Sequence, residues 1–210
     1  MLTPLLASLH IYRNQVVPVR LDIADGDGVP VPPVRAERLD VMVGQLAAEG
    51  FETIAAVAPG DPDAPGTIYA RVLVHVQDAT KAWAIDMVRG DLVQSYVELV
   101  TEWEDGTALC TVSHTNPTIF EPLPRLRQTV VPGAGVTELV ARHRVASSSV
   151  GGMRLDPAAQ HPVAAAQAQN REVLAHQERC GILRRRGEDY GFTLRGAWRS
   201  TFTLYRAQQA

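Results

Sequence analysis

The stretch that decides the fold is residues 96–113, YVELVTEWEDGTALCTVS. Apolar and polar side chains alternate on both sides of Asp105-Gly106. An Asp-Gly pair favours the positive-φ turn that closes a tight hairpin. We therefore predict two strands, residues 96–101 and 108–113, that pair antiparallel.

The same period of two continues upstream of this hairpin. Residues 68–76 alternate along their length, and Trp83, Ile85 and Met87 repeat the pattern. Residues 51–58 are also expected to form a core strand. Because turn formers separate these runs, the centre of the chain is predicted to be a largely antiparallel sheet.

Helical periodicity flanks the strands on both sides. It covers residues 35–49, 137–146 and 162–180, the last beginning at Pro162, which suits a first helical position. Residues 196–206 fit either a helix or a strand, and we favour a helix. Helices that follow runs of strands, rather than alternating with them, predict an α+β fold with a largely antiparallel sheet and helices covering one face.

Residues 24–33, ADGDGVPVPP, are rich in turn formers and in prolines that cannot donate to a sheet. We predict a loop here that separates an amino-terminal helix and extended arm, residues 1–33, from an α+β domain, residues 34–210. The arm is expected to dock through Leu5, Leu6 and Leu9.

Composition excludes some classes of function. A chain of 210 residues that is 46% hydrophobic has enough apolar side chains for a core, and its formal charge of −3 disfavours a nucleic-acid partner. The two cysteines and the lack of a secretory segment at the amino terminus suggest a cytoplasmic location. The apolar run at residues 2–9 is too short to span a membrane.

Catalytic signatures are few. The sequence has no glycine-rich nucleotide motif, no zinc-ligand pair and no serine-hydrolase elbow, so it favours a non-enzymatic domain without a cofactor or metal. Cys110 and His114 would be roughly 13 Å apart on an extended strand. We therefore interpret Cys110 as a small buried thiol rather than a nucleophile.

The candidate binding site is the long proline-containing connection after residue 113. Its polar groups, together with those of the helix at residues 137–146, are expected to converge. The alternatives are ordinary turn chemistry for Asn116 before Pro117 and a core position for His143 on the apolar face of its helix. The residues assigned to the site are His114, Thr115, Asn116, Glu121, His143 and Arg144.

Three segments carry a family resemblance: residues 101–107 (TEWEDGT), residues 120–124 (FEPLP), and residues 139–144, which end in His143-Arg144. In these segments the chain resembles uncharacterised bacterial α+β proteins, some of which carry an amino-terminal membrane anchor. The resemblance implies an α+β fold and brings no activity with it.

Three functions remain as hypotheses. The first is a non-enzymatic interaction or structural domain that binds a protein partner or self-associates. The second is a small-ligand binder or enzyme that uses residues 114–124. The third is a peripheral membrane protein that uses the amino-terminal helix through Leu5, Leu6, Leu9 and Tyr12.

Overall fold

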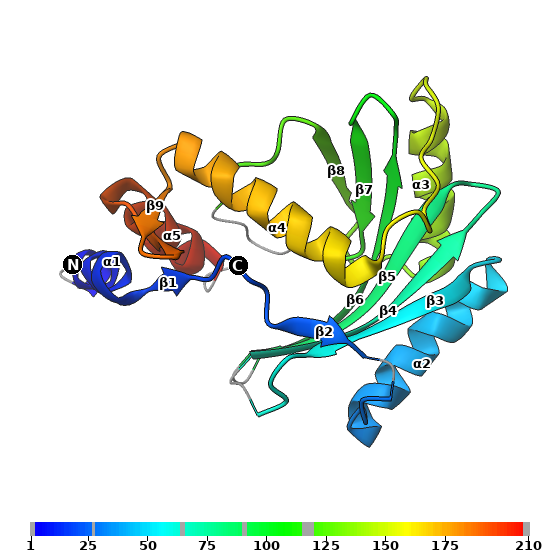
Figure 1. Ribbon diagram of the computed structural model, residues 1–210, viewed down its shortest axis with the longest axis horizontal. Helices are drawn as coiled ribbons and strands as arrows, with labels where there is room; N and C mark the ends of the chain where they lie inside the picture. The colour runs from blue at the N-terminus through cyan, green and yellow to red at the C-terminus, as the bar shows by residue number, and fades with distance from the viewer. Residues whose placement is uncertain (1–2, 27, 64–65, 90–91, 115–119, 208–210) are drawn as a thin grey trace. The chain divides into compact units, whose positions relative to one another are not determined.

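The computed structural model describes residues 3–26, 28–63, 66–89, 92–114 and 120–207. These residues form five helices and ten strands, and the strands lie in two mostly antiparallel sheets (Figure 1). The predicted α+β class with a large antiparallel sheet is confirmed. Within the same residues, no helix combines the length and the apolar character that crossing a membrane requires.

The chain divides into two compact units. Unit 1 consists of Met1–Leu21, Asn116–Leu123 and Ala166–Ala210, and unit 2 consists of Asp22–Thr115 and Pro124–Ala165. Each unit is therefore assembled from segments that are distant in the sequence. The predicted boundary between residues 33 and 34 stays a prediction.

In the described part of unit 2, seven strands form one sheet in the order β2-β3-β4-β5-β6-β7-β8. Neighbouring strands are antiparallel except β7 and β8, which are parallel. A parallel pair needs a longer connection than a hairpin does, which explains the long segment between these two strands. The strands are β2 (Ile23–Asp25), β3 (Glu52–Pro59), β4 (Gly66–His75), β5 (Thr80–Arg89), β6 (Leu92–Glu102), β7 (Ala108–Val112) and β8 (Leu126–Val130).

Two helices, α2 (Pro33–Ala48) and α3 (Val136–Ser148), cover one face of this sheet, which we call the helix face (Figure 1). Leu46 of α2 and Leu139 of α3 are fully buried and pack in one cluster with Leu99 of β6. The predicted covering of one face by helices is confirmed.

The opposite side of the sheet, which we call the second face, has its own apolar cluster. Val57, Ala70 and Val72 form the buried part, and Trp83 and Ile85 pack against it. Successive side chains of a strand point to opposite faces, so neighbouring residues of one strand have different surroundings.

A buried polar network ties α2 to the helix face. The carboxylate of Asp86, which is fully buried, accepts hydrogen bonds from Arg35 Nε at 2.6 Å, Arg38 Nε at 2.6 Å and Ser95 Oγ at 2.7 Å. Arg35 also donates to the Thr67 hydroxyl at 2.6 Å. The carboxylate thus replaces its lost hydration with three charged or polar donors, as a buried charge requires.

The hairpin predicted at Asp105-Gly106 joins β6 and β7, which pair from Glu102 and Ala108 onward. Gly106 has a φ of +82°, whereas Asp105 does not have a positive φ. The Asp105 carboxylate accepts a hydrogen bond from the Thr107 backbone N–H at 2.8 Å, and this bond lowers the pKa of Asp105. The turn therefore requires glycine at one position only.

Unit 1 is organised around a three-stranded sheet in the order β1-β10-β9. Its core contains Ile11, Leu174, Ile182, Tyr190 and Phe192. Helix α4 begins in unit 2 and continues into unit 1. The elements are α1 (Thr3–Asn14), β1 (Val16–Val17), α4 (Pro162–Arg179), β9 (Leu183–Arg186), β10 (Asp189–Phe192) and α5 (Leu194–Ala207).

The amino-terminal helix α1 packs within unit 1. Ile11 is buried, and the Ser8 hydroxyl donates a hydrogen bond to Thr201 Oγ1 of α5 at 2.9 Å. The side chains of Leu5 and Leu6, through which the arm was expected to dock, lie outside the described residues. In the described part, Ser8, Ile11 and Tyr12 make docking contacts.

Two predictions about the helices of the carboxyl-terminal part are confirmed. Helix α4 begins at Pro162, as predicted, and Gly181 follows it with a φ of +70°. Residues 196–206 belong to α5, because Ala197, Ser200 and Thr201 are buried at helical spacing.

Candidate functional site

The structure places the residues of the predicted site in different parts of the molecule. Thr115 and Asn116 lie outside the described residues, and Glu121 belongs to unit 1. His114 contacts side chains on the second face of the sheet, whereas His143 bonds to side chains on the helix face. The sheet separates the two histidines, so His143 does not converge on His114 as the sequence suggested.

His143 is a core residue of unit 2. Its Nδ1 lies 2.8 Å from Thr111 Oγ1, its Nε2 lies 2.9 Å from Thr101 Oγ1, and Thr101 in turn bonds to Thr80. Both ring nitrogens are therefore satisfied by threonine hydroxyls. Burial lowers the pKa of His143 to about 4, so the ring is neutral at physiological pH.

This burial predicts a pH-dependent stability. Between pH 6.5 and about 4, the unfolded chain binds a proton at His143 that the folded chain does not bind. The contribution of neutral His143 to the free energy of unfolding is therefore fully present above pH 6.5. It is lost as the pH decreases through this window, which lowers the free energy of unfolding by about 3 kcal/mol. Denaturant titrations at several pH values check this expectation. The difference from a His143→Gln variant isolates the effect from carboxylate titration, and parallel pH profiles for the two proteins would contradict it.

Arg144 joins three elements at one end of the sheet. Its Nε donates to Asp78 Oδ2 at 2.7 Å, and its Nη1 lies 3.6 Å from Glu49 Oε2. His75 Nδ1 accepts a hydrogen bond from the Asp78 backbone N–H at 3.1 Å. These contacts stabilise the turn between β4 and β5, in which Ala79 has a φ of +48°, so Arg144 has a structural role here.

Glu121 is engaged within unit 1. Its carboxylate pairs with Arg199 of α5. The fully buried amide of Gln177 accepts from the Glu121 backbone N–H and donates to the Glu121 carbonyl, both at 2.8 Å. These bonds fix residue 121 to α4 and α5.

His114 belongs to a polar cluster on the second face, which we call the Glu98 cluster. Gln94 Nε2 lies 2.8 Å from His114 Nε2, and the rings of Tyr96 and His114 are 5.8 Å apart. The Cys110 thiol donates to Glu98 Oε1 at 3.3 Å. The cluster consists of Gln94, Tyr96, Glu98, Cys110 and His114.

Burial controls the protonation of this cluster. It raises the pKa of Glu98, raises the pKa of Tyr96 to about 12, and raises the pKa of the Cys110 thiol. A thiol reacts as a thiolate, so Cys110 is not an activated nucleophile.

Gln94 and Tyr96 were not predicted from the sequence as neighbours of His114. Predicting these contacts required the register of the hairpin, because the pairing of Glu98 with Val112 sets Tyr96 opposite His114. The Asp-Gly turn indicated that register, since facing residues follow from the turn position.

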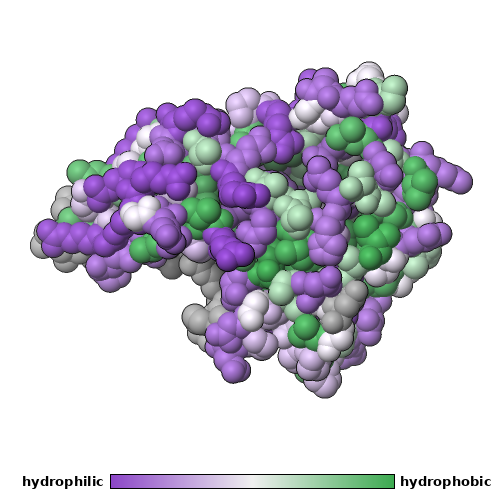
Figure 2. Space-filling view, viewed as in Figure 1, coloured by the Kyte–Doolittle hydropathy of each residue, from purple (hydrophilic) through white to green (hydrophobic). Residues whose placement is uncertain are grey.

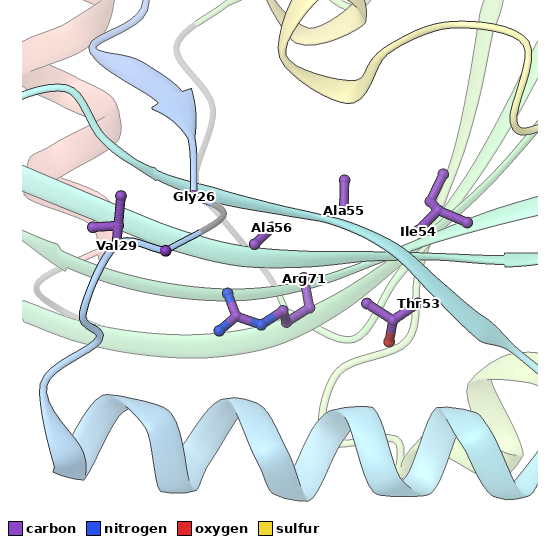
Figure 3. Close-up of a pocket in the computed structure, with 8 residues that line it drawn as sticks. Gly26, Val29, Thr53, Ile54, Ala55, Ala56 and Arg71 are labelled. Carbon is purple, nitrogen blue, oxygen red and sulfur yellow. The ribbon is translucent and has the colours of Figure 1, made fainter.

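A separate hollow of about 360 Å³ lies at the edge of the sheet in unit 2, between β3 and the chain that leads into α2 (Figure 3). The side chains of Arg71 and Thr53 point to the side of the sheet that α2 covers (Figure 3). Ile54 and Ala55 both point the other way, because the register of β3 on β4 shifts between Thr53 and Ala55 at a β-bulge. The lining residues are Gly26, Gly28, Val29, Thr53, Ile54, Ala55, Ala56 and Arg71.

The Arg71 guanidinium is the charged group of this hollow. Its Nη1 donates to the Ala70 carbonyl at 3.3 Å, and no acidic side chain of the described residues forms an ion pair with it. Arg35 and Arg38, by contrast, share the carboxylate of Asp86. Arg71 is therefore available to an anion.

The outer edge of β3 beside this hollow is free in the described part of the chain. Strand β2 pairs only with residues 57–59 of β3, and Gly26 N–H adds one bond to the Ala56 carbonyl. A Cβ atom on Gly26 would lie 2.9 Å from the Val57 carbonyl carbon, so glycine permits the chain to leave the edge here. Residues 52–55 remain without a strand on that side, and Ile54 is 40% exposed.

No group of three or more His, Cys, Asp or Glu side chains that could hold a metal occurs in the described segments. Comparisons of the chain with models of protein families, with curated proteins and with solved structures found no match. The candidate sites are therefore the Glu98 cluster and the Arg71 hollow with its adjoining edge.

Proposed function

We propose that this chain is a non-enzymatic interaction domain that binds an extended segment of a protein partner along residues 52–55 of β3. A carboxylate of the segment, most simply its carboxyl terminus, pairs with Arg71. The observation that carries the proposal is the free strand edge beside a hollow that holds an arginine without an ion-pair partner.

Unpaired backbone groups give this strand edge its capacity to bind a peptide. An exposed strand edge presents backbone donors and acceptors to an added strand, which supplies affinity through main-chain hydrogen bonds. The exposed side chain of Ile54 adds apolar contact. A guanidinium binds a carboxylate through paired hydrogen bonds and so fixes the position of a bound segment along the edge.

The test selects peptides with free carboxyl termini from a random library on the full chain and measures their Kd. We expect Arg71→Ala, or amidation of the peptide carboxyl terminus, to weaken binding about tenfold or more, because a charged hydrogen bond is lost. Ile54→Lys should also weaken binding by placing a charge at the edge. Hydrogen exchange at residues 52–55 should slow when the peptide binds.

Arg127→Ala is the matched control, because Arg127 is an exposed arginine on β8, the strand at the other edge of the sheet. It should leave Kd unchanged. Selected peptides that bind wild type, Arg71→Ala and Ile54→Lys equally would contradict the proposal. If no peptide binds, and the chain dimerises in a way that Ile54→Lys abolishes, a second copy of the chain occupies this edge instead.

As a second candidate we propose peripheral contact with a membrane through unit 1, supported by the distribution of charge. Unit 1 contains ten arginines and five acidic residues, a formal charge of +5, and unit 2 contains ten basic and eighteen acidic residues, a formal charge of −8. In the view of Figure 2, hydrophilic residues cover most of the surface over β9 and the carboxyl end of α4. The net charge of the whole chain conceals this basic unit, which anionic lipids would attract.

The use of residues 114–124 as a ligand or enzyme site, self-association and a cytoplasmic location all stay predictions. Residues 115–119 of that segment lie outside the described part of the chain. The thiol of Cys110, which belongs to the Glu98 cluster, is protonated, and this supports noncovalent binding rather than covalent chemistry there.

A further inference from the structure

Helix α5 of unit 1 carries small side chains on one face and large apolar side chains on another. In the described part of α5, the small residues Ala197, Ser200 and Thr201 are buried on the packed face. Gly196 lies so close to Ile182 that a Cβ atom on it would be 2.1 Å from the Ile182 carbonyl oxygen. Small residues let a helix approach its neighbour closely, and these residues provide such a contact for this part of α5.

Another face of α5 carries large apolar side chains at helical spacing, which we call the α5 stripe: Leu194, Trp198 and Phe202. Phe202 is half-buried. Leu194 is 63% exposed and Trp198 is 49% exposed. The rings of Trp198 and Phe202 contact each other at an interplanar angle of 44°, with their centroids 4.6 Å apart, which pre-orders the aromatic surface. A helix that docks on a protein core usually buries such residues, so the α5 stripe is left for another apolar environment.

Unit 1 also presents exposed arginines. Arg195 is exposed one residue after Leu194, and its Nη1 donates to the Cys180 carbonyl at 3.3 Å. Arg184, Arg185 and Arg186 of β9 are also exposed. An exposed tryptophan on a helix in a basic unit fits the interface of an anionic bilayer, because the indole lies at headgroup depth while guanidinium groups pair with lipid phosphates.

We propose that the α5 stripe inserts into the headgroup region of anionic membranes. The inference deepens the second candidate function by naming its contact surface and its lipid class. The first helix offers less in the described residues, since Ile11 is buried, Tyr12 lies under the Arg184 guanidinium at 4.5 Å, and Leu9 is half-buried. The acidic unit 2 would be repelled by the same lipids.

Sedimentation of the full chain with vesicles tests this surface. The vesicles contain either phosphatidylcholine alone or phosphatidylcholine with phosphatidylglycerol. We expect binding to the anionic vesicles only, reduced at high salt by screening, and a blue shift of tryptophan emission on binding. Trp198→Ser should lower the apparent affinity about tenfold or more because apolar burial is lost. Arg195→Glu should lower it further at low salt.

Val145→Ser is the matched control, since Val145 is 72% exposed on α3 of unit 2. It should bind like wild type, and all three variants should melt at the wild-type temperature because the residues are exposed. Vesicle binding that Trp198→Ser leaves unchanged would overturn the α5 assignment and leave membrane binding standing. The absence of binding to anionic vesicles would overturn both, and equal binding to neutral vesicles would overturn the assignment of anionic lipids. Neither result bears on the proposed binding of a peptide at Arg71, because peptide binding is measured separately.

Discussion

Gly196→Ala is expected to destabilise the protein by about 3 kcal/mol, at the upper end of the range for overpacking. The new methyl group would lie 2.1 Å from the Ile182 carbonyl oxygen and 3.0 Å from its carbonyl carbon. Both atoms belong to the backbone, so relief requires a shift of α5 rather than a new rotamer. Such a shift disturbs the buried contacts of Ala197 and the Ser8–Thr201 hydrogen bond. Denaturant unfolding measures the loss.

Gly44→Ala provides the matched control for this variant. Gly44 is also within a helix, α2, but a Cβ atom there would meet nothing within 4 Å. Replacement should stabilise the protein by about 0.5 to 1 kcal/mol, because alanine has the higher helix propensity. Opposite signs for the two glycines would establish that packing against Ile182, and not helix propensity, sets the outcome at position 196. Equal signs would contradict this reasoning.

Asp86→Ala should cost about 3 to 5 kcal/mol, the range measured when one partner of a buried ion pair is removed. The carboxylate is fully buried and is bound by Arg35, Arg38 and Ser95. Without it, the Arg35 guanidinium, whose side chain is only 10% exposed, loses its countercharge beneath α2. We expect a large decrease in the free energy of unfolding.

Glu138→Ala is the control for the ion pair. Glu138 pairs with Arg142 on α3 at 2.7 Å, yet both side chains are more than half exposed. A surface pair of this kind contributes about 0.5 kcal/mol or less. If Glu138→Ala and Asp86→Ala destabilised the protein equally, burial would not be the source of the Asp86 contribution.

Much of the local structure followed from the sequence by itself. Alternation along residues 68–87 and 96–113 reflects the two-residue period of a strand with unlike faces, and Asp105-Gly106 supplied the turn between β6 and β7. Pro162 and Gly181 marked the two ends of α4, because proline has a fixed φ that suits the first turn of a helix and glycine readily adopts the positive φ that follows the last turn. These signals act within a few residues of the chain.

Contacts between distant segments were decided only by the tertiary structure. The predicted approach of His143 to His114 required knowledge of the strand register, because a change of one residue moves a side chain to the other face. The free edge of β3 depends on where β2 stops, and the exposure of Trp198 depends on Gly196 meeting Ile182. The sequence determined which elements form, since propensity and periodicity are local. The tertiary structure determined which side chains remain without partners, since that depends on every segment that packs nearby.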